Sequence, residues 1–193
     1  MPYRKRYMSS HDIDWYACVN HKWIYASSMG GLLPNKINND TFLPLLQTIS
    51  YNLPDLVEED KIIVNNDLIV RRYERAIRVY REYYIQNDDL LNRFLENFTL
   101  YSFGRAYTAE FISMARKGFI SYIRENIDDP LDNNYIIVAE PSEEISVKLS
   151  DFFDSPLPEW LNNEQFKAYL NMISRRGPIG NSHQAIDLWD LFQ

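Results

Sequence analysis

The sequence predicts an α+β fold: a central group of three amphipathic helices with a small antiparallel sheet from an N-terminal hairpin and later strands, plus a C-terminal helix and tail. Three observations carry this prediction. Apolar residues recur every three or four positions through the middle of the chain, as they do along one face of an α-helix. Short runs of aromatic and β-branched residues, typical of strands, occur on either side of that region. The chain of 193 residues is 46% hydrophobic, which is enough for a core of its own.

The N-terminal hairpin is predicted from two β-prone runs, Asp14–Val19 and Trp23–Ser27, which flank a polar trio at 20–22. Asn20 tolerates the positive φ that a tight turn requires, and Gly30-Gly31 ends the second strand. A two-stranded ribbon is marginally stable alone, so its aromatic side chains need a cover. We predict that later strands or a neighbouring subunit supply the cover, and that the hairpin is an assembly element. The aromatic residues that this interpretation places at an interface are Trp15, Trp23 and Tyr25.

A short helix and the first helix of the central group are predicted in the next part of the chain. Apolar residues at helical spacing indicate a helix over 41–52. The clearest periodic stretch follows it and begins at Asn66 or Asp67, either of which can cap a helix. Its apolar stripe has spacings of 3, 4, 3 and 4 residues and consists of Val70, Tyr73, Ile77, Tyr80 and Tyr84.

The second and third central helices follow directly. Asp88 opens the second helix, whose apolar residues continue the same rhythm towards Gly104, a predicted break or kink. The third helix spans about 105–126 and places Phe119 and Tyr122 on its apolar face. Short links between helices favour antiparallel packing of neighbours, and the spacing also permits contacts between subunits.

Three arginines share one face of the first central helix: Arg71, Arg75 and Arg78. Arginines on one helical face can follow phosphates while nearby tyrosines stack on bases, so this face predicts an alternative function in binding nucleic acid or modulating the host. The competing interpretation is structural, because Glu74 and Glu82 are close enough to pair with arginines along the same helix. The acidic overall balance also argues against nucleic acid as the main partner.

The last strands and the last helix are predicted after residue 130. Tyr135–Ala139 and Ile145–Leu149 have the composition of strands and are separated by an acidic, proline-containing link. Asn163 caps a helix whose apolar residues run to Ile173, and Gly177-Pro178 closes it. These elements complete the predicted antiparallel sheet by pairing with each other or with the N-terminal hairpin.

The domain organisation predicted from these elements is a single α+β domain over residues 1–178 and a docking tail over residues 179–193. The tail combines aromatic and acidic side chains, as do short segments that insert aromatic residues into a groove on a partner. It can also fold back on its own chain. The two residues that we expect to dock are Trp189 and Phe192.

Charge is distributed unevenly along the chain. The whole sequence has 20 basic and 27 acidic side chains, a net charge of −7. Residues 1–126 hold 16 basic and 15 acidic side chains, whereas residues 127–193 hold 4 and 12. This asymmetry predicts complementary faces, within one molecule or between copies, although solubility alone also explains it.

Motifs for catalysis, cofactors and metals are missing from the sequence. Cys18 is the single cysteine, so an intrachain disulfide is ruled out and a reducing compartment is favoured. His11 and His21 lie at opposite ends of the predicted hairpin, too far apart to share a metal ion. No GxSxG, GxGxxG or P-loop pattern occurs. We therefore expect a non-enzymatic protein with no cofactor and no metal.

Membrane association is not predicted either. No apolar run approaches the roughly 18 residues of a membrane-spanning helix. The basic opening residues also lack the apolar region of a signal peptide. We therefore expect no membrane partner and synthesis inside the cell.

Two stretches near the N-terminus, Ile13-Asp14-Trp15-Tyr16 and Ala26-Ser27-Ser28-Met29-Gly30-Gly31-Leu32-Leu33-Pro34, resemble small virion proteins of crAss-like tailed phages. Those proteins include the ring proteins stacked beneath the portal in the head–tail connector. The Asn-, Ile- and Tyr-rich composition, poor in Gly and Ala, is similar as well. The resemblance implies a non-enzymatic, oligomeric ring subunit that contacts itself and neighbouring virion proteins. Direct contact with nucleic acid, which the arginine face would make, is expected to be secondary. The resemblance also implies a location in the virion after synthesis in the cytoplasm of the bacterial host.

Overall fold

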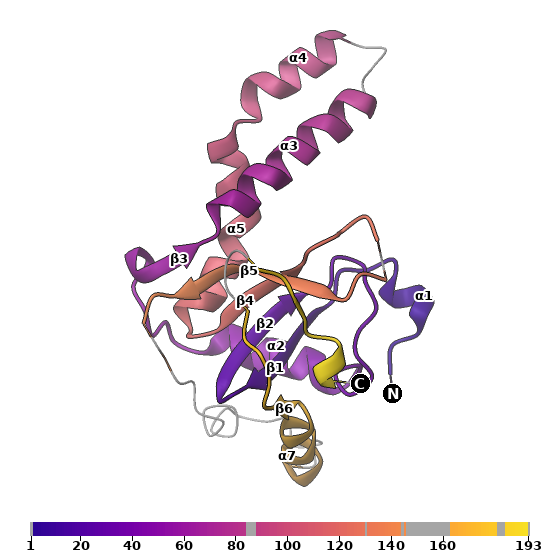
Figure 1. Cartoon of the computed structure of the whole chain (residues 1–193), viewed down its shortest axis with the longest axis vertical. Helices are drawn as coiled ribbons and strands as arrows, with labels where there is room; N and C mark the ends of the chain where they lie inside the picture. Colours follow the sequence, from indigo (N-terminus) through magenta and orange to yellow (C-terminus); the bar gives the residue numbers. More distant parts are fainter. Residues whose placement is uncertain are drawn as a thin grey trace.

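A mixed β-sheet forms the body of the protein, and a group of helices rises from one end of it (Figure 1). The computed structural model describes residues 2–83, 88–129, 131–143, 145, 163–180 and 184–192. In this part of the chain the strands are β1 (Asp14–Val19), β2 (Lys22–Ser27), β3 (Ile62–Val64), β4 (Ile120–Arg124), β5 (Asn134–Pro141), β6 (Ser174–Arg175) and β7 (Ile186–Asp187). The helices are α1 (Lys5–Met8), α2 (Phe42–Asn52), α3 (Asn66–Tyr83), α4 (Asp88–Asn97), α5 (Leu100–Arg116) and α7 (Asn163–Met172). The predicted α+β class is confirmed.

The sheet differs from the prediction in size and in strand direction. Its seven strands follow the order β3-β5-β4-β2-β1-β6, with β7 paired to β5. The β2–β4 and β1–β6 pairs are parallel, and the other pairs are antiparallel. Parallel neighbours need a crossover connection, and the crossover from β2 to β4 contains α2, β3, α3, α4 and α5. The expectation of an antiparallel sheet is therefore wrong at these two pairs.

The N-terminal hairpin forms as predicted and lies inside the sheet, between β4 and β6. β1 and β2 pair in register from Asp14↔Ser27 to Val19↔Lys22. Asn20 and His21 form the turn with φ values of 50° and 66°, in the left-handed region that a two-residue hairpin turn requires. Local sequence therefore determines this pair of strands.

Both faces of the hairpin are covered by other parts of the same chain. The Tyr25 ring packs on Phe111 of α5, with centroids 5.8 Å apart, and the Trp15 ring packs on Phe192 at 6.1 Å. Trp15, Trp23 and Tyr25 are at most 1% exposed. They cannot reach another subunit while the chain is folded. Their assignment to an interface is therefore corrected: they are core residues.

The end of α5 corrects the helix predicted over 105–126. This helix ends at Arg116, and Gly118 follows it with a φ of 90° that glycine adopts at little cost. The next residues are rich in aromatic and β-branched side chains and continue into β4. Phe119 and Tyr122 are consequently buried at the sheet and do not lie on a helix face.

The start of α5 also differs from the prediction. Gly104 lies inside this helix, and the interruption between α4 and α5 falls at Thr99, the N-cap of α5. The Thr99 side chain accepts a hydrogen bond from the backbone N–H of Ser102, and the Ser102 hydroxyl accepts one from the backbone N–H of Thr99. This capping box fixes the helix start, because it satisfies backbone donors that a helix end leaves free.

The helices that rise from the sheet are held together by aromatic rings. We call α3, α4 and residues 100–108 of α5 the helical arm (Figure 1). Tyr80 of α3 packs on Phe94 of α4, with ring centroids 3.9 Å apart. Phe98 lies between Tyr73 at 5.4 Å and Phe103 at 5.6 Å. Aromatic contacts of this kind add stability beyond simple burial, and here they make α3, α4 and α5 one unit.

The C-terminal helix is confirmed as α7, whereas the strand predicted at Ile145–Leu149 lies outside the described residues except for Ile145. Within the predicted tail, β7 pairs with β5, and Phe192 is fully buried. The backbone N–H of Lys36 donates to the Phe192 carbonyl at 3.0 Å. The expected docking tail is therefore corrected: residues 184–192 are part of the same domain, and Phe192 is a core residue. No helix in the described ranges is long and apolar enough to cross a bilayer.

Candidate functional site

An apolar groove lies between α3 and α5 at the base of the helical arm. It has a volume of about 660 Å³, and the residues that line it include Ile69, Val70, Leu100, Tyr101, Gly104 and Arg105. Gly104 lies against α3, because a Cβ atom at this position would be 3.3 Å from Cγ2 of Ile69. A residue without a side chain thus lets the two helices approach each other and leaves the groove open.

Large apolar side chains are unusually exposed on the arm. Tyr83 is 80% exposed and Tyr101 is 72% exposed. Four aliphatic side chains of the arm also face solvent: Val70, Val79, Leu90 and Leu100. Elsewhere in the described chain, exposed large apolar side chains are scattered singly over separate elements. Among these residues, Val70, Leu100 and Tyr101 lie together at the groove, and grouped exposure of this kind marks a contact surface more often than single residues do.

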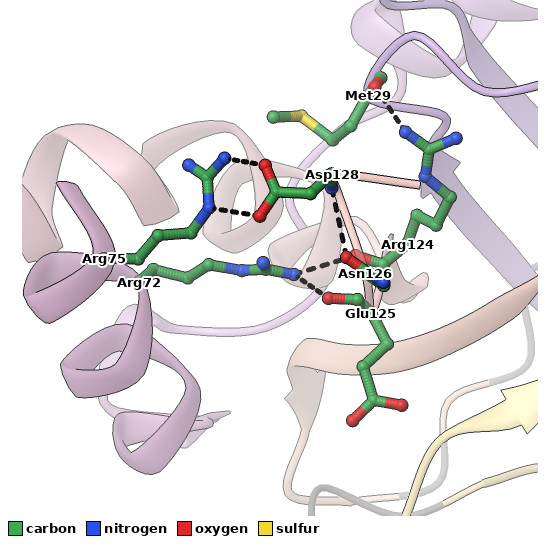
Figure 2. A network of polar contacts seen from close by, with 7 residues as sticks. All are labelled: Met29, Arg72, Arg75, Arg124, Glu125, Asn126 and Asp128. Atoms are coloured by element: carbon green, nitrogen blue, oxygen red, sulfur yellow. Dashed lines mark hydrogen bonds and ion pairs between the residues drawn. The ribbon is translucent and has the colours of Figure 1, made fainter. Parts of the chain in front are cut away.

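Two arginines of α3, Arg72 and Arg75, are engaged by the chain at the end of β4 and just after it (Figure 2). The buried Arg72 guanidinium donates to the carbonyl oxygens of Arg124 at 2.8 Å and Glu125 at 2.6 Å. Arg75 forms a two-bond ion pair with Asp128, which lowers the pKa of that carboxyl group. Among the three predicted arginines, Arg71 lies 3.8 Å from a carboxylate oxygen of Glu125, and Arg78 is exposed. These contacts attach the arm to the loop after β4.

Removal of Arg72 is expected to destabilise the protein more than removal of Arg75. Arg72→Ala leaves two carbonyl oxygens without their charged donor in a buried place, and we expect a loss of about 2 kcal/mol in the free energy of unfolding. Arg75→Ala removes an exposed ion pair, which we expect to cost less than about 1 kcal/mol. Urea denaturation of the two variants measures the difference. Equal losses would contradict this assignment of roles, and Arg78→Ala serves as the control with no expected change.

A second arginine, Arg124, is buried beneath the loop that follows β2. It is 1% exposed, and its Nη2 atom donates to the Met29 carbonyl oxygen at 2.7 Å. Met29 and Gly30 both have positive φ, at 46° and 73°, so the loop is sharply turned at this point. Gly31 then lies directly against the Arg124 guanidinium. The Gly30-Gly31 pair therefore has a packing role beside a buried cation.

Asp14 lies at the start of β1, close to other acidic and phenolic side chains. Burial, followed by the charges of Glu110 and Asp12, raises the pKa of its carboxyl group to about 7. Gln47 of α2 donates to Oδ2 of Asp14 at 3.3 Å. Asp12 has a different role, because its oxygens accept bonds from the Ser27 hydroxyl and the Met29 backbone N–H. The described residues contain no group of three or more His, Cys, Asp or Glu side chains placed to hold a metal ion.

The histidines and the cysteine of the hairpin do not come together as a reactive site. The His11 ring stacks on Tyr7 at a centroid distance of 3.9 Å, before β1 begins, whereas His21 forms the turn at the other end of the strand. Cys18 is buried between β2 and β6, and burial raises the pKa of its thiol. A raised thiol pKa disfavours the thiolate, which is the reactive form.

We expect Cys18 to react slowly with thiol reagents in the folded protein. The thiol is buried and protonated at neutral pH, so a disulfide reagent at pH 7.5 should modify it at least about a hundredfold more slowly than after unfolding in guanidinium chloride. Absorbance at 412 nm after addition of Ellman's reagent follows the reaction. Equal rates in the folded and unfolded protein would show that the thiol is accessible.

The groove is the part of the site that sequence reasoning missed. The spacing of Leu91, Phe94, Phe98 and Tyr101 predicts an apolar stripe that faces inward, and Gly104 indicates a helix break. One signal for the groove is present in the sequence: a glycine within a continuous helical pattern, one turn after a large aromatic residue. Comparison with protein-family models, curated proteins and solved structures finds no match for this chain.

Proposed function

We propose that this protein is a non-enzymatic structural subunit of a tailed-phage particle, of the connector-ring kind that its N-terminal stretches resemble. The observation that carries the proposal is the helical arm, which stands away from the sheet (Figure 1) and exposes apolar side chains at its groove and near the end of α3. Exposure of a surface of this type to water is unfavourable, and the free energy falls when a protein partner covers it. The arm is the contact element in this proposal, in place of the hairpin and the tail.

The division of the chain supports the same function. The aromatic residues of the hairpin and Phe192 are buried within the sheet domain, which supplies a stable body. Arg72 and Arg75 attach the arm to this body, so a force on the arm is transmitted to the sheet. A rigid projection on a folded body is suited to fixing the spacing between neighbouring subunits.

The experiment that tests the proposal measures assembly. Light scattering and negative-stain electron microscopy of the purified chain, alone and with the other particle proteins of its phage, are expected to show assemblies of many copies. Tyr83→Ser with Leu90→Ser should weaken assembly, whereas Tyr51→Ser with Met172→Ser, at exposed apolar positions outside the arm, should leave it unchanged. A chain that stays monomeric and joins no particle would overturn the proposal.

The alternative function, binding of nucleic acid by Arg71, Arg75 and Arg78, has less support. Arg75 is engaged by Asp128, and Arg71 lies near Glu125, so part of the positive charge is already neutralised. Fluorescence anisotropy with single-stranded and double-stranded DNA at 20 mM salt distinguishes the two functions. Binding that is lost in Arg78→Glu would favour the alternative.

A further inference from the structure

The two edges of the arm groove carry opposite charges. On α3, Asp67, Val70 and Glu74 follow one another at spacings of three and four residues, and all three are exposed. Val70 lines the groove, and Asp67 and Glu74 lie one helical turn before and after it on α3. Arg71 lies between the two acids on the helix and forms an ion pair with Glu125 at 3.8 Å. On α5 the edge is formed by Tyr101 and Arg105, which are also exposed. The groove is thus an apolar strip between an acidic edge and a basic edge.

Arg105 is held at its edge by Tyr101. The guanidinium carbon lies 5.9 Å from the centroid of the Tyr101 ring, and Nη1 donates to the Tyr101 hydroxyl at 3.4 Å. A guanidinium over an aromatic face is attracted by the ring, so its position beside the groove is favoured. This pair presents a cation and a large apolar ring together, a combination that is enriched where proteins bind each other.

We infer that the groove binds the same groove of a second copy of this chain, with a two-fold axis that runs along the arm. This inference rests on the proposed function and names its partner. A rotation about that axis places the α3 edge of one copy over the α5 edge of the other, and the same contact is made twice. Acidic side chains then face Arg105, and Val70 faces Tyr101.

The heights of the α3 and α5 residues along the long axis of the arm agree with this pairing. α3 and α5 run in opposite directions, and Gly104 lies beside Ile69. Arg105 is therefore level with the turn of α3 that holds Asp67 and Val70. An axis along the arm preserves these heights, so Asp67 of one copy meets Arg105 of the other. An axis across the arm would instead place like charges together, which disfavours that arrangement.

The test is a charge exchange between the two edges, measured by analytical ultracentrifugation. Asp67→Lys and Arg105→Glu are each expected to raise the dissociation constant of the two-copy complex about tenfold or more, because each introduces two like-charge contacts. The variant with both changes should return to within about threefold of the unmodified chain. Tyr101→Asp should abolish pairing, since Tyr101 is exposed and its loss does not disturb the core.

A control variant and the pattern of results distinguish failure of this inference from failure of the proposed function. Arg93→Glu, a charge reversal on exposed α4, should leave pairing unchanged, and melting temperatures show whether each variant is folded. A chain that forms no pairs, or pairs that all the edge variants leave unchanged, overturns the inference. If large assemblies form equally well with all the edge variants, the proposed function stands and the groove-to-groove inference falls. Pairs that never form larger assemblies would retain the inference and overturn the ring proposal.

Discussion

Replacement of Gly31 by alanine is expected to lower the free energy of unfolding by about 3 kcal/mol, because it forces a side chain into a fully packed place. A Cβ atom at this position would lie 2.8 Å from Cζ of Arg124 and 3.0 Å from the Ser28 carbonyl oxygen. Arg124 is buried, and its Nη2 atom is bonded to the Met29 carbonyl, so its guanidinium cannot move aside without losing that bond. Urea denaturation measures the loss.

A double-mutant cycle shows whether Arg124 is the cause. Arg124→Leu shortens the side chain and removes the buried charge, and Gly31→Ala in that background should cost less than about 1 kcal/mol. Gly30→Ala is the matched control. Gly30 has a φ of +73° and meets no atom closer than 3.5 Å, so its substitution should cost about 1 kcal/mol with or without Arg124. Additive effects of Gly31→Ala and Arg124→Leu would show that the two residues do not interact.

Asp14→Asn is expected to make the protein more stable in alkaline solution and to leave it almost unchanged at pH 4, with the difference growing between pH 4 and pH 7. The Asp14 carboxyl group has a pKa of about 7 in the folded protein against 3.8 ordinarily, owing first to burial and then to Glu110 and Asp12. A raised pKa stabilises the fold fully below pH 4, and this contribution is lost as the pH rises through 7. Asparagine resembles the protonated acid and does not titrate.

The size of the effect is set by how far solvent weakens the charges. Three pKa units correspond to about 4 kcal/mol at most, but Glu110 is exposed, so about 2 kcal/mol is expected at pH 9. The groups beside Asp14 also include the phenols of Tyr16 and Tyr25 and the amide of Gln47, and none of these should titrate between pH 4 and 9. Thermal unfolding of both proteins from pH 4 to pH 9 provides the measurement. Parallel curves would contradict the assignment.

Local sequence patterns predicted the elements that depend on neighbouring residues. The hairpin turn depends on Asn20, which tolerates positive φ, and the helices at 41–52 and from Asn163 depend on apolar residues at helical spacing. The predicted 105–126 helix failed because Phe119 and Tyr122 fit a helical spacing, although Gly118 separates them from α5. The parallel pairing of β2 with β4 joins distant segments, and no local pattern encodes it.

The candidate site was harder to predict than the fold. Aromatic residues in a sequence indicate burial, but not whether the same chain or another subunit covers them. Trp15, Trp23 and Phe192 are covered within the chain. Tyr101 shows the opposite case, since it belongs to an apolar stripe and is nevertheless exposed. Which side of a helix faces solvent depends on the tertiary packing of the arm, and spacing alone does not determine it.

The helical arm is also an insertion between two adjacent strands. Ile24 of β2 pairs with Ile120 of β4, so about half of the chain closes into one loop when these strands meet. Loop closure over that distance costs about 4 kcal/mol of chain entropy, yet doubling the loop adds only about 0.6 kcal/mol. The arm can therefore become longer or shorter by whole helical turns while the sheet stays intact. Evolution, or an engineer, can change the reach of this protein without rebuilding its core.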